Sequence, residues 1–386
     1  MKKLLSLALA LLLLTACGAP APASTTAPPE TTAPPTTTVP TTMPPTSGLP
    51  LYADLRYIAA YPDYQPKVVF EAHEYDRDWM HTYTFNESMS FSGSEDLQAQ
   101  ILEEGKNPGL GVRSLHAQSV TGEGVNVAII DQNLLLNHPE FAGKITAYYD
   151  SGCDQPDDQG SMHAPAVVSL LVGETIGVAP GAKVYFGAAP SWTGDSAYFA
   201  ECLNWIIAEN EKLPDGEKIR VVSVSAAPSG VGSPYTMNQE MWDEAVLSAQ
   251  KAGILVLDCR ENSTTGIIGP AYYDRADRES PVKCSGGFPP VGNFSGTDWI
   301  GVPNAYRTMA EEYIEGEPSY QYWGKGGLSW AIPYAAGVLA LGWQVNPELS
   351  GEQMVELLFE TCATGANGAN IIDPVAFIAA VQETVK

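Results

Sequence analysis

From about Pro108 to the C-terminus, the sequence predicts an α/β domain with a mostly parallel central sheet and helices on both faces. Two observations support this class. Continuous apolar runs, which suit strands buried on both faces, alternate with segments of helical periodicity. Polar residues also follow several of these runs directly, as they do at the carboxyl edge of a parallel sheet.

The individual elements follow from this alternation. Strands are predicted at 125–130, 182–187, 219–225, 253–257 and 300–302. The periodicity predicts helices at 165–172, 196–212, 238–252, 333–345 and 350–361, and Ser350 with Gln353 forms a predicted capping box at the start of the last one. Between residues 51 and 106 the pattern is weak and aromatic-rich, with short strands predicted only at 68–70 and 83–85.

The N-terminus predicts export. Lys2 and Lys3 precede an apolar run, Leu4 to Leu14, that is too short to span a bilayer. The run ends in Leu-Thr-Ala-Cys-Gly, which resembles the lipobox of bacterial lipoproteins, in which the cysteine, here Cys17, becomes the acylated N-terminus. An ordinary secretory signal that contains a cysteine by chance is the alternative. We therefore expect a protein that is lipid-anchored at Cys17 on the bacterial cell surface, outside the cytoplasm.

Four regions are expected: a lipoprotein signal peptide (1–17), a disordered Pro/Thr-rich linker (18–48), an N-terminal extension (49–107) and the α/β domain (108–386). The extension is either packed on the domain or an inhibitory pro-segment, and the sequence leaves both open. Acidic residues outnumber basic ones by 45 to 20, which excludes nucleic acid as an expected partner.

Two polar residues of the domain point to proton-transfer chemistry. Asp131 ends the apolar strand 125–130, and a carboxylate buried there needs a partner such as an imidazole. Capping of the next turn is the alternative. His163 stands at the start of an apolar helix, where a histidine is commonly a cap or a packed side chain. The chain has only five histidines, so the choice of a general base is narrow.

Two more residues point to anion stabilisation. Asn262 follows the strand 253–257 and can aim its amide at an oxyanion, although a turn residue is the commoner role. Ser329 follows three glycines and precedes an apolar helix, whose N-terminal amides favour negative charge. A helix N-cap is the ordinary role of such a serine.

In this order, Asp131, His163, Asn262 and Ser329 resemble the catalytic residues of the subtilase (peptidase S8) family of serine proteases. Surrounding segments resemble it too: TGEGVNVAIID with HPEF, GVAPGAKVY, VVSVSAAPSG, GLSWAIPYAAG and QVNPELS. The resemblance implies a subtilisin-like three-layer α/β/α fold and a serine endopeptidase acting on peptides or proteins. It implies that Ser329 is the nucleophile, His163 the base and Asp131 its partner, with Asn262 and the Ser329 N–H as the oxyanion hole.

The motifs depart from the family pattern at each block. Where the family usually has Asp-Thr-Gly, this chain has Asp-Gln-Asn starting at residue 131. Where the family usually has His-Gly-Thr, it has His-Ala-Pro starting at residue 163. Asn133 tolerates positive φ and Pro165 suits a first helical turn, so both local structures are expected to survive. At the nucleophile, Gly-Leu-Ser-Trp replaces Gly-Thr-Ser-Met.

The segments that the resemblance places along the substrate cleft differ more from the family pattern. Ser-Ala-Ala replaces Ser-Leu-Gly on the strand that pairs with substrate, and Cys-Arg-Glu-Asn replaces Ala-Ala-Gly-Asn on the pocket wall. Bulkier and charged side chains narrow such a groove, so we expect restricted specificity. The expected substrate-binding residues are Ser225, Ala226, Ala227, Cys259, Arg260 and Glu261. A catalytically inactive surface protein that binds peptides or a protein partner is the alternative.

No cofactor is expected. No cysteine spacing is typical of a zinc site, while Cys259 with Cys284 or Cys202 with Cys362 are alternatives for disulfides. Calcium is common in subtilases, and Asp154, Asp157 and Asp158 form an acidic loop before His163. A solvated loop is the favoured interpretation, with a structural calcium ion as the alternative.

Overall fold

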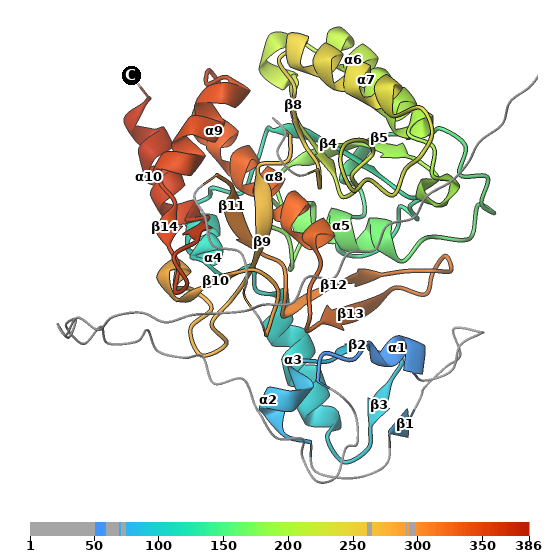
Figure 1. Cartoon of the computed structure of the whole chain (residues 1–386), viewed down its shortest axis with the longest axis vertical. Helices are drawn as coiled ribbons and strands as arrows, with labels where there is room; N and C mark the ends of the chain where they lie inside the picture. The colour runs from blue at the N-terminus through green and yellow to red at the C-terminus, as the bar shows by residue number, and fades with distance from the viewer. Residues whose placement is uncertain are drawn as a thin grey trace, which may run out of the picture. The chain divides into compact units, whose positions relative to one another are not determined.

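The centre of the fold is a five-stranded parallel sheet (Figure 1). The computed structural model describes residues 51–58, 69–70, 75–260, 265–290, 292 and 298–385. The strand order is β5-β6-β4-β7-β8, with bounds Ile145–Asp150, Lys183–Ala188, Asn126–Asp131, Ile219–Val224 and Leu255–Leu257. Asp131 pairs with Ala188, and Ile130 pairs with Val224, so the carboxyl ends of three strands meet at one edge.

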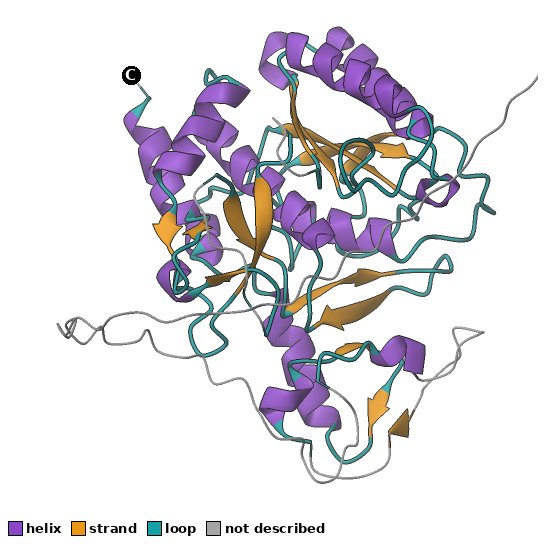
Figure 2. Cartoon of the chain, viewed as in Figure 1, coloured by secondary structure: helices purple, strands orange, loops and turns teal. Residues whose placement is uncertain are grey.

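Helices cover both faces of this sheet (Figure 2). Along β4, Val127 and Ile129 belong to the apolar cluster that contains helices α5 (His163–Val172) and α8 (Leu328–Val345). Ala128 and Ile130 belong to the cluster that contains α6 (Ala197–Lys212) and α7 (Gln239–Lys251). This alternation is what a strand buried on both faces requires. It confirms the predicted three-layer α/β/α fold.

Two helices begin earlier than predicted. Helix α5 starts at His163 itself, with Pro165 in its first turn, and α8 starts at Leu328 and continues through Pro333. A backbone N–H in the first turn of a helix has no intrahelical acceptor, so a proline there costs no helical hydrogen bond. Pro165 can therefore be the third residue of α5 and need not be its first. The predicted capping box of Ser350 and Gln353 is confirmed at the start of α9 (Gly351–Glu360).

A second, mixed sheet packs against α8. Its order is β10-β9-β11-β15-β14, with bounds Ser285–Gly286, Ile268–Tyr272, Ile300–Pro303, Asn370–Ile371 and Ala363–Thr364. Helix α10 (Pro374–Glu383) contacts α4 (Val112–His116), α8 and α9. Three short 3-10 helices, η1 to η3, span Ser191–Thr193, Asp215–Glu217 and Pro281–Lys283.

The described part of the N-terminal extension joins the domain through a third sheet. Strand β2 (Thr84–Asn86) pairs antiparallel with β13 (Ser319–Trp323), which pairs with β12 (Arg307–Glu311). Helix α3 (Glu95–Lys106) packs on β12 and β13. The extension also contains α1 (Leu55–Ile58), β1 (Val69–Phe70), α2 (Arg77–Met80) and β3 (Ser90–Phe91). Buried aromatic residues, including Tyr83, Phe85 and Phe91, form its core together with Tyr322 of β13.

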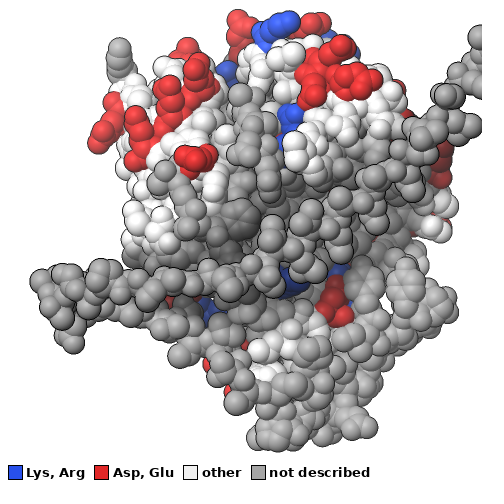
Figure 3. Space-filling model, viewed as in Figure 1, with Lys and Arg blue, Asp and Glu red and all other residues white. Residues whose placement is uncertain are grey.

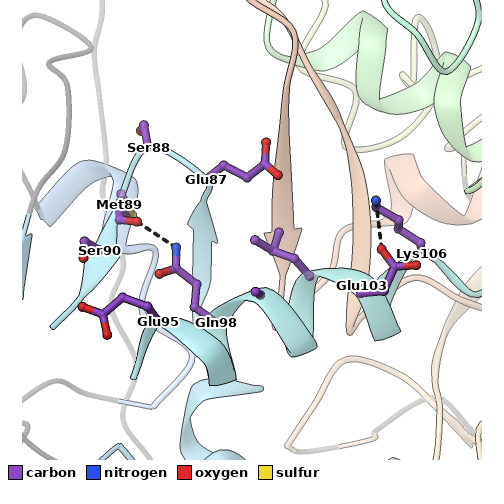
Figure 4. A pocket seen from close by; sticks show the side chains of 10 residues that line it. Glu87, Ser88, Met89, Ser90, Glu95, Gln98, Glu103 and Lys106 are labelled. Atoms are coloured by element: carbon purple, nitrogen blue, oxygen red, sulfur yellow. Dashed lines mark hydrogen bonds and ion pairs between the residues drawn. The ribbon is translucent and has the colours of Figure 1, made fainter. Parts of the chain in front are cut away.

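A cavity of about 510 Å³ lies in this N-terminal region (Figure 4). It is bounded by the turn between β2 and β3 and by α3, where Gln98 donates to the backbone oxygen of Met89 at 2.8 Å and Lys106 pairs with Glu103 at 3.0 Å. Its lining includes none of the residues predicted to catalyse or to bind substrate.

Helix α8 is long and apolar enough to cross a membrane by composition, but 78% of it is buried inside the fold. It is therefore the central interior helix, contacting α5, β7, β9 and β11. On the face shown in Figure 3, acidic side chains gather over the α6–α7 and α9–α10 regions. This charge repels polyanions.

The two alternative disulfides are wrong. Cys153, Cys202, Cys259, Cys284 and Cys362 are all free thiols. Burial raises the pKa of the Cys153 and Cys202 thiols to about 12, so these two side chains stay protonated and behave as small apolar groups.

Candidate active site

Asp131 and His163 meet at the carboxyl edge of the parallel sheet. Asp131 is the last residue of β4 and is 5% exposed, while His163 is the first residue of α5. The imidazole Nδ1 lies 2.8 Å from one carboxylate oxygen and 2.9 Å from the other. The Gln132 N–H donates to the same carboxylate at 2.8 Å. The sheet and the helix therefore hold the carboxylate and the imidazole in direct contact.

This contact sets both the tautomer and the basicity of His163. Because Nδ1 is directed at the carboxylate, Nε2 is the nitrogen available for proton transfer. Burial lowers the pKa of His163, but the charge of Asp131 and its hydrogen bond outweigh burial, and the net pKa is raised above the usual 6.5. Asp131 thus strengthens the base that it orients.

Ser329 lies in the first turn of α8, next to β7. Its backbone carbonyl accepts a hydrogen bond from Ser225 Oγ at 2.8 Å. That carbonyl has no intrahelical donor, because the residue four positions later is Pro333. The Ser329 N–H also has no intrahelical acceptor at this position of a helix, so it can donate to an anion.

The Ser329 hydroxyl is hydrogen-bonded to a backbone carbonyl. Its Oγ donates to the Ser225 carbonyl at 3.3 Å, and within the described part of the chain no hydrogen bond joins it to His163. The side chain of α8 that contacts the imidazole is instead Trp330, whose ring centroid lies 5.0 Å from that of His163. The structure thus joins Asp131 to His163, places Trp330, the residue after Ser329, against the imidazole, and has the Ser329 hydroxyl on the Ser225 carbonyl.

The other predicted cleft residues lie where β7 and β8 end. The Cys259 N–H donates to the Ala226 carbonyl at 2.9 Å, and Ser233 Oγ donates to the Ala227 carbonyl at 2.6 Å. Asn133 donates to the Gln159 carbonyl at 2.7 Å. Its φ is not positive, so the turn after Asp131 does not need the left-handed backbone conformation that asparagine tolerates. The predicted residues Glu261 and Asn262 lie outside the described residues, as does Cys17.

Arg260 is turned into a polar network. Its guanidinium pairs with Asp258 and with Asp243 of α7, each at 2.7 Å, and donates to Ser229 and Thr265. The Arg260 side chain is 10% exposed and that of Asp258 is fully buried. Burial raises the pKa of Asp258, although Arg260 opposes this. Arg260 therefore ties the β7 and β8 loops together.

The acidic loop before His163 forms no cation cage. Asp154, Asp157 and Asp158 are exposed, and among the residues that the structure describes no three His, Cys, Asp or Glu side chains gather to hold a metal ion. This geometry tests neither the alternative of a structural calcium ion nor the expectation that no cofactor is required.

The sequence did not predict three residues that lie against the site. Trp330 was noted only as a departure from the family motif, yet its ring packs on the imidazole. Gln321 and Trp323 of β13 lie behind Trp330 and Met162. Their sole signal in the sequence is their nearness to Ser329 along the chain.

Comparisons with known proteins agree with this geometry. A family model described as the subtilase family matches residues 122–305, which include Asp131 and His163 and end before Ser329. The serine protease AprX of Bacillus subtilis is 27% identical over 63% of this chain and 62% of its own length. Subtilisin NAT of Bacillus subtilis subsp. natto is 25% identical over 64% of this chain and 63% of its own. The chain thus spans about three-fifths of the length of these relatives.

Two solved structures share the fold. Fervidolysin from Fervidobacterium pennivorans, a keratinolytic enzyme related to subtilisin, superposes with a TM-score of 0.53 at 17% identity, covering 72% of this chain and 45% of its own. A structure of the subtilase cytotoxin SubAB superposes with a TM-score of 0.54 at 16% identity, covering 72% of this chain and 95% of its own. At these identities the likeness concerns the fold.

Proposed function

Because the chain belongs to the subtilase family, we propose that it is a serine endopeptidase that uses Ser329, His163 and Asp131. The observation that carries the proposal is the pair of short contacts between His163 Nδ1 and the buried Asp131 carboxylate. A general base needs such a partner, both for its orientation and for the stabilisation of its protonated form.

In the proposed reaction, the Ser329 side chain rotates from the Ser225 carbonyl toward His163 Nε2. Ser329 Oγ then forms a bond to the scissile carbonyl carbon and gives its proton to Nε2, and Asp131 stabilises the imidazolium. The imidazolium protonates the leaving amine as the peptide bond breaks. Water, deprotonated by His163, then releases the acyl group and regenerates the Ser329 hydroxyl.

The tetrahedral oxyanion needs fixed donors. The Ser329 N–H, in the first turn of α8, is one donor that the fold supports. The side-chain amide of Asn262 is proposed as the second, on the family motif alone. Losing one such donor typically slows turnover about 10²- to 10³-fold.

A fluorophosphonate probe tests the proposal directly, because it labels only a serine that a neighbouring base activates. We expect the full chain to be labelled and Ser329→Ala to be unlabelled. Ser88→Ala, which removes an exposed hydroxyl of the N-terminal extension, is the matched control and should label like wild type. A folded wild-type chain that stays unlabelled would falsify the proposal.

We also propose that specificity is restricted. Ala226 and Ala227 carry side chains in the segment that follows β7, and the hydrogen bonds of Arg260 to Asp258 and Asp243 fix the segment that follows β8. A rigid, narrowed groove accepts fewer side chains than an open one. Cleavage of a random peptide library should therefore give a few strong sites, and even cleavage across the library would contradict this.

Anchoring at Cys17 on the outer side of the membrane is the remaining part of the proposal. Its support is the lipobox-like sequence, together with curated relatives that include an extracellular serine proteinase from a Thermus strain. Mass spectrometry of the N-terminal peptide should find acylated Cys17, and Cys17→Ser should release the protein from membranes.

The second candidate is a surface protein without catalysis. The observation that favours it is the Ser329 hydroxyl, which bonds to a backbone carbonyl and not to the imidazole. In this alternative the cleft binds peptides but leaves both the probe and the peptides intact.

A further inference from the structure

The N-terminal extension reaches the site through Arg56. The backbone around Arg56 is held by β2: the Thr84 N–H donates to the Ala53 carbonyl at 3.0 Å, and Asp54 bridges to Thr84. The Arg56 guanidinium is held from its other side by Asp54, whose carboxylate lies 2.7 Å from Nη2. The side chain is only 8% exposed, so its fork is fixed in one direction.

A first route to the catalytic histidine runs through an amide. Arg56 Nη1 donates to the side-chain oxygen of Gln321, which also accepts from Trp323 Nε1 at 2.9 Å. The amide nitrogen of the fully buried Gln321 donates to the Met162 carbonyl at 3.4 Å. Met162 immediately precedes His163 and is the N-cap of α5, so this route ends at the backbone that carries the imidazole.

A second route runs through aromatic rings in contact. The Arg56 guanidinium lies 4.5 Å from the ring centroid of Trp323. Trp323 meets Trp330 edge-on at 5.1 Å, and the Trp330 ring lies 5.0 Å from that of His163. Trp330 is 2% exposed and cannot move without displacing a neighbour. The two routes start at one guanidinium and converge on one residue.

We propose that Arg56, Gln321, Trp323 and Trp330 are positioning residues that hold His163 for catalysis, so that the N-terminal segment around Arg56 is a retained part of the working site. This inference rests on the proposed peptidase function. An imidazole held from both its backbone and its ring face loses little freedom on reaching the transition state, and small misplacements of such a group slow turnover steeply.

The test compares variants of the full chain by their rate of labelling with a fluorophosphonate probe. We expect Arg56→Ala to slow labelling about tenfold. Arg56→Lys keeps the charge but loses the planar fork, and should slow labelling about threefold. Arg77→Ala is the matched control, because Arg77 also belongs to the extension but pairs only with exposed residues, and should label like wild type. Folded Arg56→Ala and Arg56→Lys proteins that label at the wild-type rate would overturn the proposal.

If Arg56→Ala does not fold, Trp323→Phe decides, because it removes the bond to Gln321 and reduces the contact with Trp330. A folded Trp323→Phe protein should label about threefold more slowly, and a wild-type rate would overturn the proposal.

A readout without activity separates this inference from the function on which it rests. The ring-proton resonances of His163, assigned by comparison with His163→Ala, should shift in Arg56→Lys and not in Arg77→Ala. If the wild type is unlabelled by the probe, the peptidase proposal fails while these resonances still report the positioning. Unchanged His163 resonances in a folded Arg56→Lys protein would refute the positioning role.

Discussion

The two halves of the site differ in how firmly the fold sets them. On the base side, Asp131 is nearly inaccessible and makes two short contacts with His163, and Trp330 covers the imidazole. On the nucleophile side, Ser329 is partly exposed and its hydroxyl bonds to the Ser225 carbonyl. Burial and charge fix the first half, whereas the proposed function requires the Ser329 side chain to leave the Ser225 carbonyl, a rotamer change that bound substrate can drive.

The difference has a physical origin. A carboxylate at the end of an interior strand is stable only with a partner, so folding itself selects the contact between Asp131 and His163. A hydroxyl has several acceptors of similar quality, and without substrate it takes the one within reach. Variants of the base side should therefore have the larger effects.

The largest effect is expected from His163→Ala. It removes the base while leaving the Ser329 helix intact, and members of such triads act as a unit, so kcat should fall about 10⁶-fold. Initial rates on a cleaved peptide provide the measurement. A loss under 100-fold would place the base elsewhere, whereas His116→Ala, outside the site, should keep full activity.

The next effect is expected from Asp131→Asn. An amide can donate to Nδ1, which stabilises the wrong tautomer and removes the charge that supports the imidazolium, so kcat should fall about 10⁴-fold. Unchanged circular dichroism would show that the loss is chemical. Wild-type turnover in this variant would mean that the short contacts with His163 are structural only.

Arg260→Ala tests how firmly the loops after β7 and β8, on the nucleophile side of the site, are held, and its readout is the free energy of unfolding. It leaves the Asp258 carboxylate buried without its cation, which should lower the free energy of unfolding by about 3 kcal/mol. Urea denaturation measures this. Arg77→Ala, which breaks a pair whose side chains are 44% and 49% exposed, should cost under about 1 kcal/mol. Equal costs for the two variants would contradict the role of Arg260 in holding the loops.

Ser225→Ala should have a smaller effect. It removes the 2.8 Å hydrogen bond to the Ser329 carbonyl, worth about 1 kcal/mol, so kcat/KM should fall about fivefold. Ser248→Ala removes an equivalent hydroxyl from the exposed face of α7 and should leave kcat/KM unchanged. An effect above 100-fold would mean that Ser225 takes part in the chemistry.

The smallest effect is a displacement of the pH profile. His163 acts as a base only when unprotonated, and Asp131, the charged group facing it from β4, raises its pKa above 6.5; α8 adds only the uncharged Ser329 and Trp330. Activity should therefore be lost as pH falls through a midpoint above 6.5. The stabilising contact of protonated His163 is present below 6.5 and lost as pH rises through the folded pKa. A kcat/KM profile with its acidic midpoint below 6.5 would contradict this.

The central sheet was predictable because its strands are buried on both faces. A strand such as β4 leaves a continuous apolar signature, and the polar residue that ends it, Asp131, stands out. The comparisons support the subtilase assignment and confirm the three-layer fold, and the structure has Asp131 against His163 as expected.

The N-terminal extension was largely unpredictable for the opposite reason. Strand β2 is three residues long, and what stabilises it is pairing with β13, near the other end of the chain. Most residues of helix α3 are polar, and the helix is stabilised by packing on β12 and β13. Such elements depend on tertiary partners, which a local pattern does not contain. The direction of the Ser329 hydroxyl was beyond the sequence as well, because it depends on one rotamer.

The pairing of β2 with β13 also bears on when the proposed site can assemble during synthesis of the chain. Arg56 and Gln321 are 265 positions apart, so the ribosome must finish most of the polypeptide before they can meet. The Ser329 turn follows β13 directly and is completed only afterwards. Under the proposed function, a nascent chain lacks an assembled site until β13 and the Ser329 turn have been synthesised.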